Sequence, residues 1–251
     1  KWSLLLSAGV DAEAFDMLES VAPNRAGTVV LWENVDRLIK DYSSPAGKSA
    51  QKALKGKEDA LRQHLAMVYQ RFLDPNDDRA QTISIELNGV AVDAWDPFQR
   101  ELSELVVEDR IEVEMVDGKK APFVVRAFIL PRREEFPSDE LAKQAQLTND
   151  RQGIYIYREN RLIHDADWLG LFQKEPHITL LRVEFSFDHR LDSAFHLDIK
   201  KSQIILNEDL ADWLQKEFLP APRREANARS REGQQKSISQ KGSKAHDRSN
   251  N

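Results

Sequence analysis

Two adjacent lysines, Lys200 and Lys201, are the side chains whose spacing most readily suggests chemistry. They follow an apolar-polar alternation at residues 195–199 and precede a helix that we expect to begin near Asn207. A lysine on a connection from a strand to a helix can project beyond the sheet as a compact cation, which suits a phosphate group. A pair of solvated surface charges is the simpler explanation, and spacing alone favours it.

A second phosphate-binding candidate, Gly47-Lys48-Ser49, fails on its spacing. A P-loop needs another glycine five positions before this tripeptide, and Tyr42 occupies that position. No Gly-x-Gly-x-x-Gly pattern occurs either. We therefore interpret Ser49 as the cap of a long helix.

Metal and nucleophile chemistry find little support in the sequence. His177, His189 and His196 have spacings that match no zinc signature, so we expect no metal site. The chain contains no cysteine, which excludes disulfides, thiolate ligands and cysteine nucleophiles. No Gly-x-Ser-x-Gly pattern of a hydrolase nucleophile is present.

The segment after Pro222 is basic, whereas the rest of the chain is acidic. The formal net charge is -6, but residues 223–251 carry eight Lys or Arg against three Asp or Glu. This basic tail has few apolar residues to offset the entropy of ordering, so we expect it to be disordered. No apolar run approaches the roughly 18 residues of a membrane span, and we expect a cytoplasmic protein that contacts no membrane.

The elements that must position these residues begin with a strand at 28–32, after Gly27. A polar link at 41–47 leads to a helix over 49–73 with an apolar face, and residues 83–92 form a hairpin through Asn88-Gly89. Residues 99–120 are charged and only partly patterned. The sequence thus predicts a long helix leading into a hairpin and a sheet.

The second half of the chain alternates between strands and helices. We expect strands at 123–130, 153–157, 181–187 and 195–199, with a helix at 138–147 and another that starts at Asn207 and ends at Pro220 and Pro222. The order strand, helix, strand over 123–157 suggests a crossover, right-handed if the two strands are parallel. The predicted fold class is α+β: a mixed sheet with helices on one face.

Three segments together resemble GHKL-type ATPases, which have the Bergerat fold. Residues 27–32 (GTVVLW) resemble the Gly-Thr strand that closes the nucleotide-binding domain. Residues 153–163 (GIYIYRENRLI) resemble a stretch of MORC-type and MutL-type transducer domains, and residues 195–202 (FHLDIKKS) resemble the strand and lysine that end those transducers. The three segments together resemble MORC-like or HSP90-like ATP-binding proteins of bacteria.

This resemblance implies roles for four residues. Lys201, with Lys200 as second choice, would reach the γ-phosphate of ATP, and Thr28 with Gly27 would lie near the adenine. A cation at the terminal phosphate favours phosphoryl transfer and links the nucleotide state to domain orientation. The alternative is that Thr28 is an ordinary residue of a strand with no role in nucleotide binding.

The resemblance also implies what this chain lacks. The catalytic glutamate, the Mg-binding asparagine and the glycine-rich lid have no counterpart here. We therefore expect ATP and Mg in the intact parent and no tightly bound cofactor or hydrolysis in this piece alone. Residues 1–44 would end an ATPase domain, 45–222 would form the transducer-like domain, and 223–251 the tail. The expected partners are the ATPase domain of the same chain and, in the parent, a second copy in a homodimer.

An alternative function is a non-enzymatic interaction module that binds nucleic acid or an acidic protein through its basic tail. Four arginines would make the contacts with phosphates: Arg223, Arg224, Arg229 and Arg231. An unrelated enzyme whose site one sequence cannot reveal also remains open.

Overall fold

The computed structural model describes residues 12–21, 23, 26–30, 32, 44, 47–114, 118–192 and 208–233. The chain divides into two compact units, residues 1–58 and 59–251. The boundary falls within the long helix α2 (Lys48–Val68), and each unit is described by itself. Residues 193–207, which include Lys200, Lys201 and the strand expected at 195–199, lie outside the described part of the chain.

The first unit contains α1 (Ala12–Val21), the beginning of α2 and an irregular stretch at residues 26–30. Residues 26–30 and 32 have no regular structure, and Val30 and Trp32 are 71% and 80% exposed. The strand predicted at 28–32 is therefore wrong for its described residues. The β-branched side chains favour a strand only where a neighbouring strand accepts their backbone groups, and no described strand pairs with them.

The predicted long helix is confirmed, with a break near its end. It forms α2 (Lys48–Val68) and α3 (Gln70–Leu73), separated at Tyr69, whose φ and ψ of -105° and 19° are not helical. The predicted apolar face is buried only towards its end, since Val68 is buried while Leu61 is 44% exposed.

The predicted hairpin is confirmed as β1 (Glu86–Leu87) and β2 (Val90–Ala91). Asn88 and Gly89 both have positive φ, 53° and 71°, as the tight turn requires. The Arg62 guanidinium of α2 donates hydrogen bonds to the carbonyls of Leu87, Val90 and Ala91, which fixes the hairpin to the helix.

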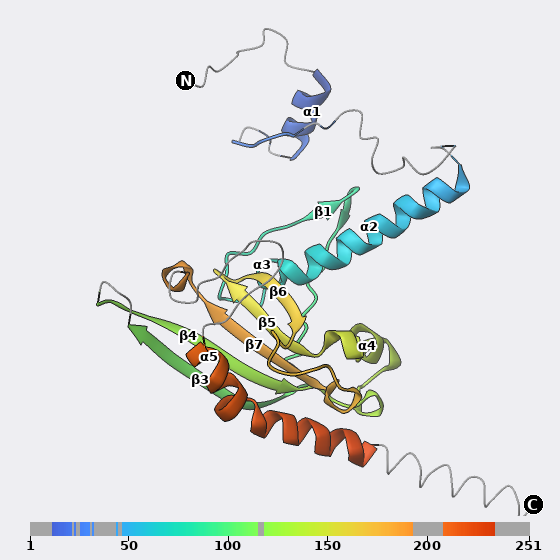
Figure 1. The fold of residues 1–251 in the computed structure, drawn as a ribbon. Coiled ribbons are helices and arrows are strands. Elements are labelled where there is room, and N and C mark those ends of the chain that lie inside the picture. The colour runs from blue at the N-terminus through green and yellow to red at the C-terminus, as the bar shows by residue number, and fades with distance from the viewer. Residues whose placement is uncertain are drawn as a thin grey trace, which may run out of the picture. The chain divides into compact units, whose positions relative to one another are not determined.

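A five-stranded mixed sheet forms the centre of the second unit (Figure 1). The order is β3-β4-β7-β5-β6, and only β5 and β7 are parallel. The α+β class and the mixed sheet are confirmed. The bounds of the strands are β3 (Glu104–Glu114), β4 (Lys120–Ile129), β5 (Gly153–Arg158), β6 (Arg161–Asp167) and β7 (Leu181–Phe187).

The expected crossover does not take the parallel form. The helix α4 (Asp139–Gln144) follows β4 as predicted, capped by the Ser138 hydroxyl, which accepts a hydrogen bond from the Leu141 amide. However, β7 lies between β4 and β5, antiparallel to the first and parallel to the second. Strands β4 and β5 therefore run in opposite directions, and the handedness rule for parallel strands does not apply to their connection.

The C-terminal helix continues further than its prolines suggest. It comprises α5 (Glu208–Trp213), a π-helical turn (Leu214–Phe218) and a helix over residues 220–233. Pro220 and Pro222 lie in the first turn of the last helix, where their missing N–H groups would have no helical partner anyway. The predicted end of the helix at these prolines is wrong.

Disorder is likewise a wrong prediction for residues 223–233, which are helical, while 234–251 lie outside the described residues. Small residues make this helix fit: Pro222 and Ala226 are buried, and a Cβ on Gly233 would come within 2.7 Å of Arg132 Cδ. A prediction of disorder from the small number of large apolar residues fails here, because small residues and arginine side chains pack this helix against the rest of the unit.

Each face of the sheet is covered, and helical residues contact both faces, so the prediction of helices on one face is wrong. One face carries the main apolar core, where Phe123, Val183 and Phe185 pack with Leu214 and Phe218 of the C-terminal helix. The opposite face carries Phe128, Tyr155 and Tyr157, which pack with Met67 and Phe98. No helix of the described residues is long and apolar enough to cross a membrane.

Candidate functional site

A row of polar side chains crosses the second face of the sheet at one register position. Glu108 on β3 pairs with Arg126 on β4, Arg126 with Glu184 on β7, and Glu184 with Tyr155 on β5. Glu184 and Tyr155 are completely buried. A carboxylate at the centre of a covered sheet needs compensating charge and hydrogen bonds.

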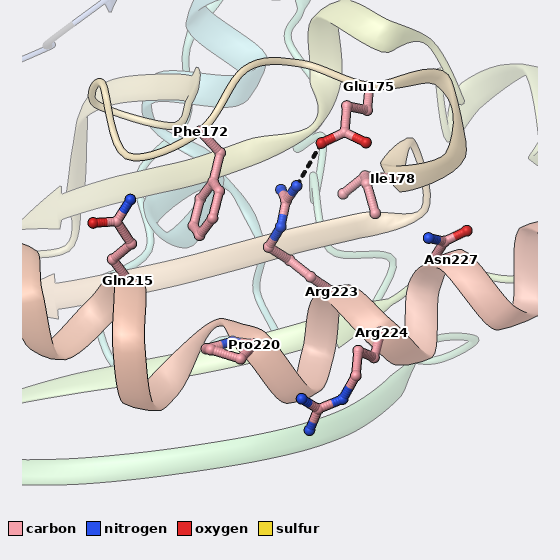
Figure 2. A pocket seen from close by; sticks show the side chains of 8 residues that line it. All are labelled: Phe172, Glu175, Ile178, Gln215, Pro220, Arg223, Arg224 and Asn227. Carbon is pink, nitrogen blue, oxygen red and sulfur yellow. Dashed lines mark hydrogen bonds and ion pairs between the residues drawn. The ribbon is translucent and has the colours of Figure 1, made fainter.

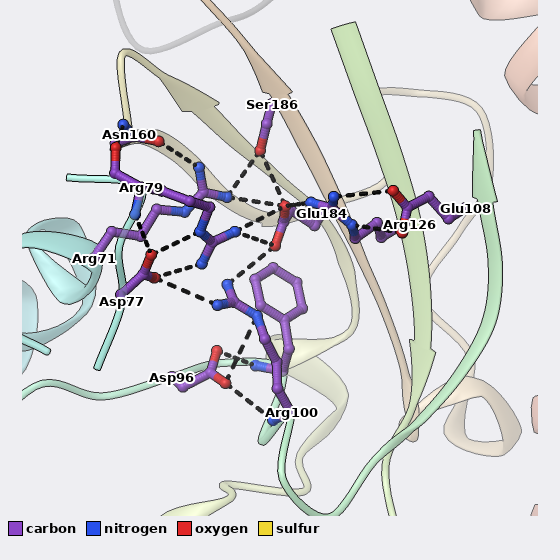
Figure 3. A network of polar contacts seen from close by, with 11 residues as sticks. Arg71, Asp77, Arg79, Asp96, Arg100, Glu108, Arg126, Asn160, Glu184 and Ser186 are labelled. Carbon is purple, nitrogen blue, oxygen red and sulfur yellow. Dashed lines mark hydrogen bonds and ion pairs between the residues drawn. The ribbon is translucent and has the colours of Figure 1, made fainter. Parts of the chain in front are cut away.

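Four arginines from separate parts of the chain supply that charge (Figure 3). The Glu184 Oε1 atom lies 2.8 Å from Arg126 Nη1, 3.0 Å from Arg71 Nη2 and 3.4 Å from Arg79 Nη1. The other oxygen, Oε2, lies 3.0 Å from Arg100 Nη2. The arginines come from α3, from the loop before β1, from the loop before β3 and from β4, so one carboxylate joins four segments.

Three further carboxylates complete the cluster around Glu184. Asp77 binds Arg79 through two hydrogen bonds and lies 3.5 Å from Arg100, whose Nε is 4.0 Å from Asp96. Glu108 accepts two hydrogen bonds of 3.0 Å from the Arg126 guanidinium. The four cations thus face four anions, and the cluster is neutral as a whole.

The pKa values of the cluster follow from burial and charge together. Burial alone would raise the pKa of Glu184, but the nearby arginines, Arg71 foremost, outweigh it and lower the pKa to about 2. Burial likewise works against the ionised form of Asp77, yet Arg79 brings its pKa down to about 2. Burial lowers the pKa of Arg71 to about 10, with Glu184 opposing the shift. All three groups stay charged at neutral pH.

Arg71 anchors the end of the long helix to the hairpin of β5 and β6. Its side chain is 1% exposed, and its guanidinium carbon lies 3.7 Å from the centre of the Tyr157 ring. It donates hydrogen bonds to Asn160 Oδ1 at 3.1 Å and Ser186 Oγ at 2.8 Å. The Asn160 amide in turn donates to the carbonyl of Arg79. Residues 69–79 are therefore bound both to the hairpin of β5 and β6 and to β7.

This hairpin is the segment 153–163 on which the resemblance to transducer domains depends. Its turn residues Glu159 and Asn160 have φ of 50° and 65°, and Arg161 lies over the Tyr69 ring at 5.6 Å. Gly153 has φ of 128°, and a Cβ there would lie 2.7 Å from the Asp167 amide nitrogen. Asn160 and Arg161 thus contact the end of the long helix, whereas Gly153 allows the close approach of β5 to the backbone of β6.

A pocket of about 190 Å³ lies beside this junction. Arg71, Asn160 and Ser186 line it together with the acidic Glu159 and Asp188. Glu159 is paired with His189 and Asp188 with Arg190, so these carboxylates are already occupied. Among the described residues no group of three or more His, Cys, Asp or Glu is placed to hold a metal ion.

A second pocket, of about 300 Å³, lies between the C-terminal helix and the connection from β6 to β7 (Figure 2). Arg223 and Arg224, both predicted to bind nucleic acid, line it. Arg223 extends towards Glu175, and its Nη2 donates a hydrogen bond of 2.7 Å to the carboxylate.

The four predicted arginines of the C-terminal segment do not form a single basic surface. Arg223 pairs with Glu175, and Arg229 lies 3.1 Å from Glu104 and 3.4 Å from Glu135. Arg224 and Arg231 are exposed, beside Glu225 and Glu232 in the sequence.

Of the other predicted site residues, Thr28 and Gly27 are exposed in the irregular stretch 26–30, and no partner for either occurs within the described residues. Lys200 and Lys201 lie outside those residues, so their place relative to the sheet stays a prediction.

Sequence reasoning missed the Glu184 cluster, although signals for it exist. Arg126 interrupts an otherwise apolar strand, and Arg182, Glu184 and Ser186 alternate with apolar residues on β7. Alternation is typical of a strand with one face in water, whereas six of the seven residues of β7 are buried. Only the covering segments 66–100 reveal that the polar face is internal.

No family model matches the chain, and no curated protein matches it.

Proposed function

We propose that this chain is the transducer region of a GHKL-type ATP-binding protein. In this role it couples ATP binding and hydrolysis, in the ATPase domain of the intact parent, to dimerisation or to movement of a partner. ATP and Mg belong to the parent, and the chain alone holds neither tightly.

The observation that carries the proposal is the junction at Arg71. A transducer must convert a displacement of one element into a displacement of a rigid body. The long helix ends in a buried arginine that binds Tyr157, Asn160, Ser186 and Glu184 on three different parts of the sheet. A force that reaches the end of this helix therefore acts on the whole sheet. The segment 153–163, which carries the resemblance, provides half of that anchor.

Within this proposal Lys201 is the sensor of the γ-phosphate, and Lys200 is the second candidate. Thr28 and Gly27 lie near the adenine in the assembled parent. Loss of the γ-phosphate removes the contact with the lysine, so the orientation of the transducer depends on the nucleotide state.

ATP turnover by the intact parent tests the sensor. Lys201→Ala should lower turnover at least about tenfold because a fixed cation at the terminal phosphate is lost, while the circular dichroism spectrum stays unchanged. Lys200→Ala is the matched control and should have a much smaller effect. If Lys200→Ala alone lowers turnover, the two roles are exchanged; if neither variant changes it, the proposed sensor is wrong.

Arg71→Lys tests the coupling in the same parent. A lysine keeps the charge but cannot stack on Tyr157 and bond Asn160, Ser186 and Glu184 together. We expect ATP binding to persist and ATP-dependent dimerisation to weaken. Arg110→Lys, on the exposed edge of β3, is the control with no expected effect. Unchanged dimerisation in a folded Arg71→Lys protein would contradict transmission through this junction.

The alternative, binding of nucleic acid through the basic tail, has less support. Arg223 forms an ion pair with Glu175 and Arg229 with Glu104, which leaves both arginines less available for phosphates.

A further inference from the structure

The strand β3 (Glu104–Glu114) forms one edge of the five-stranded sheet (Figure 1). Within the described residues its backbone pairs with β4 and with no other strand. An edge strand presents a row of N–H and C=O groups that point away from the sheet. A row of this kind can pair with a further extended segment, which then adds a strand to the sheet.

The side chains of β3 limit which segment can bind there. The strand has five acidic residues and one basic residue: Glu104, Glu108, Asp109, Glu112 and Glu114, and Arg110. Glu104 and Glu108 form ion pairs with Arg229 and Arg126. No described residue forms an ion pair with Asp109, Glu112 or Glu114, and the last two are exposed. Since like charges on neighbouring strands repel each other, β3 favours a basic segment.

A basic segment of the same chain follows the C-terminal helix. Residues 234–251 contain four basic residues and one acidic residue: Lys236, Lys241, Lys244 and Arg248, and Asp247. They contain no proline, so each residue has the backbone N–H group that strand pairing requires. This segment therefore matches β3 both in charge and in backbone chemistry.

The C-terminal helix brings this segment to the start of β3. Arg229 Nη1 lies 3.1 Å from Glu104 Oε2, and Gly233, one turn later, is the last described residue of the helix. The 18 residues after Gly233 can span up to about 60 Å, whereas the 11 residues of β3 span about 36 Å. Because the segment starts beside the first residue of β3, it can follow the whole edge in the direction of that strand.

We propose that residues 236–246 of the same chain bind along the outer edge of β3 as an additional, parallel strand. The spacing of the charges sets the register. Lys241 and Lys244 are three positions apart and lie beside Asp109 and Glu112, which have the same separation. Residues in register on neighbouring strands point to the same face of the sheet, so each lysine meets a carboxylate.

The same register is favourable at the neighbouring positions. Arg110, the basic residue of β3, lies beside Gly242, so no two cations meet. Val113, whose side chain packs against the main apolar core, lies beside Ala245, which is also apolar. The match in charge therefore extends along the strand and is not limited to one pair.

Other occupants fit this edge less well. A second copy of β3 would place one acidic strand against another, and nucleic acid has the same sign of charge as β3. A basic segment of another protein would match the charge, but the segment of this chain is tethered beside the strand. A short tether raises its effective concentration to roughly the millimolar range. This inference does not depend on the proposed transducer function.

Amide hydrogen exchange in the full chain, followed residue by residue by NMR, tests the pairing. Charge pairs at an exposed edge add little to global stability, so the exchange of the β3 amides is the sensitive measure. Lys244→Glu replaces an attractive pair by a repulsive one. The amides of residues 107–113 that point away from β4 should then exchange about fivefold faster. Lys52→Glu, an exposed residue of α2, changes the net charge equally and should leave them unchanged.

An exchange of charges between the two strands tests the register. Glu112→Lys alone should also accelerate the exchange of these amides about fivefold. Glu112→Lys together with Lys244→Glu should restore slow exchange, because the pair becomes attractive again. Glu112→Lys together with Lys52→Glu should not restore it.

Three results would overturn the proposal. The β3 amides could exchange equally fast in the unchanged protein and in the Lys244→Glu protein, or the double substitution at 112 and 244 could fail to restore slow exchange. Protection of β3 that rises with protein concentration would assign the basic segment to a second copy of the chain. Protection that is independent of concentration and restored by the charge exchange supports the proposal.

Discussion

Glu184 is held by guanidinium groups that come from four parts of the chain, and its charge is the reason they meet. The side chain is fully buried, and its two oxygens have four cationic neighbours within 3.5 Å. A buried ion pair adds little net stability by its presence, but removal of one partner leaves the others buried and uncompensated. The role of Glu184 should therefore show most clearly when its charge is removed.

Glu184→Gln keeps the shape of the side chain and removes the charge. We expect the free energy of unfolding to fall by about 3–5 kcal/mol, since several arginines lose their shared counter-charge. Urea denaturation followed by circular dichroism measures the change. Glu112→Gln, at an exposed position of β3, should change it by less than about 0.5 kcal/mol. Equal effects of the two substitutions would mean that the cluster is not essential to the fold.

The same cluster predicts how stability depends on pH. The pKa values of Glu184 and Asp77 are about 2 in the folded protein, below their usual 4.5 and 3.8. Groups whose folded pKa is depressed stabilise the fold fully above the unfolded value and lose that contribution as pH falls towards the folded value. The urea midpoint should thus decline between about pH 4.5 and pH 2. Asp77→Asn should make the decline shallower, and a constant midpoint down to pH 3 would contradict the assignment.

At the scale of elements, backbone geometry separates two glycines that look alike in the sequence. Gly153 begins β5 with φ of 128° and has the Asp167 backbone where a Cβ would stand. Gly56 lies within α2, and a Cβ there would meet nothing within 4 Å. One position needs glycine, whereas the other only loses helix propensity by having it.

Alanine at these two positions should therefore have opposite effects. Gly153→Ala should lower the free energy of unfolding by at least about 2 kcal/mol because of a positive φ and a backbone clash. Gly56→Ala should raise helix stability by up to about 1 kcal/mol. Thermal unfolding of the two variants measures both effects. Similar melting temperatures would show that the backbone at β5 can relax.

The elements also show how far the sequence predicts this fold. The long helix, the hairpin at Asn88-Gly89, α4 with its Ser138 cap and strands β4, β5 and β7 follow from local patterns. β3 was not expected, because its charged residues hide the alternation of Val107, Ile111 and Val113. The position of β7 between β4 and β5, and the burial of its polar face, depend on contacts between distant segments. Local sequence patterns do not predict such contacts.

The candidate site was less accessible to prediction than the fold. The position of Lys200 and Lys201 between an expected strand and helix singles them out, and a resemblance gives them a role, but they lie outside the described residues. Arg223 was selected for its charge, but its role in the structure depends on Phe172 and Glu175, more than 40 residues earlier. The spatial neighbours of a charged side chain decide whether it is free to bind, and they are not visible in spacing.

At the scale of the whole molecule, the C-terminal helix completes the apolar core of the second unit, residues 59–251. Leu214, Phe218, Leu219 and Ala226 belong to the cluster that covers β4, β5 and β7. Arg229 adds ion pairs to Glu104 and Glu135 at the far end of the helix. The end of the described chain is therefore part of the folded unit.

Two truncations distinguish the helix from the residues that follow it. A chain that ends at Leu219 should lose at least about 3 kcal/mol of folding stability, because part of the core becomes exposed. A chain that ends at Gly233 should unfold at nearly the same temperature as the full chain. Binding of a hydrophobic dye should rise only in the shorter form. Equal stability of both truncated forms would mean that residues 220–233 contribute little to the core.

The row of Glu108, Arg126, Glu184 and Tyr155 has a consequence for how the chain tolerates insertions and deletions. Successive residues of a strand face opposite sides of the sheet, so a shift of β7 by one residue would turn Glu184 into the apolar core and Phe185 towards the arginines. Such a misaligned sheet would bury several unmatched charges at once. The row therefore makes a shifted register of the sheet unfavourable. Single-residue insertions in β4 or β7 should destabilise the fold and be selected against far more strongly than insertions in the loops. A sheet that pairs in the wrong register during folding should be unstable and should re-form in the native one.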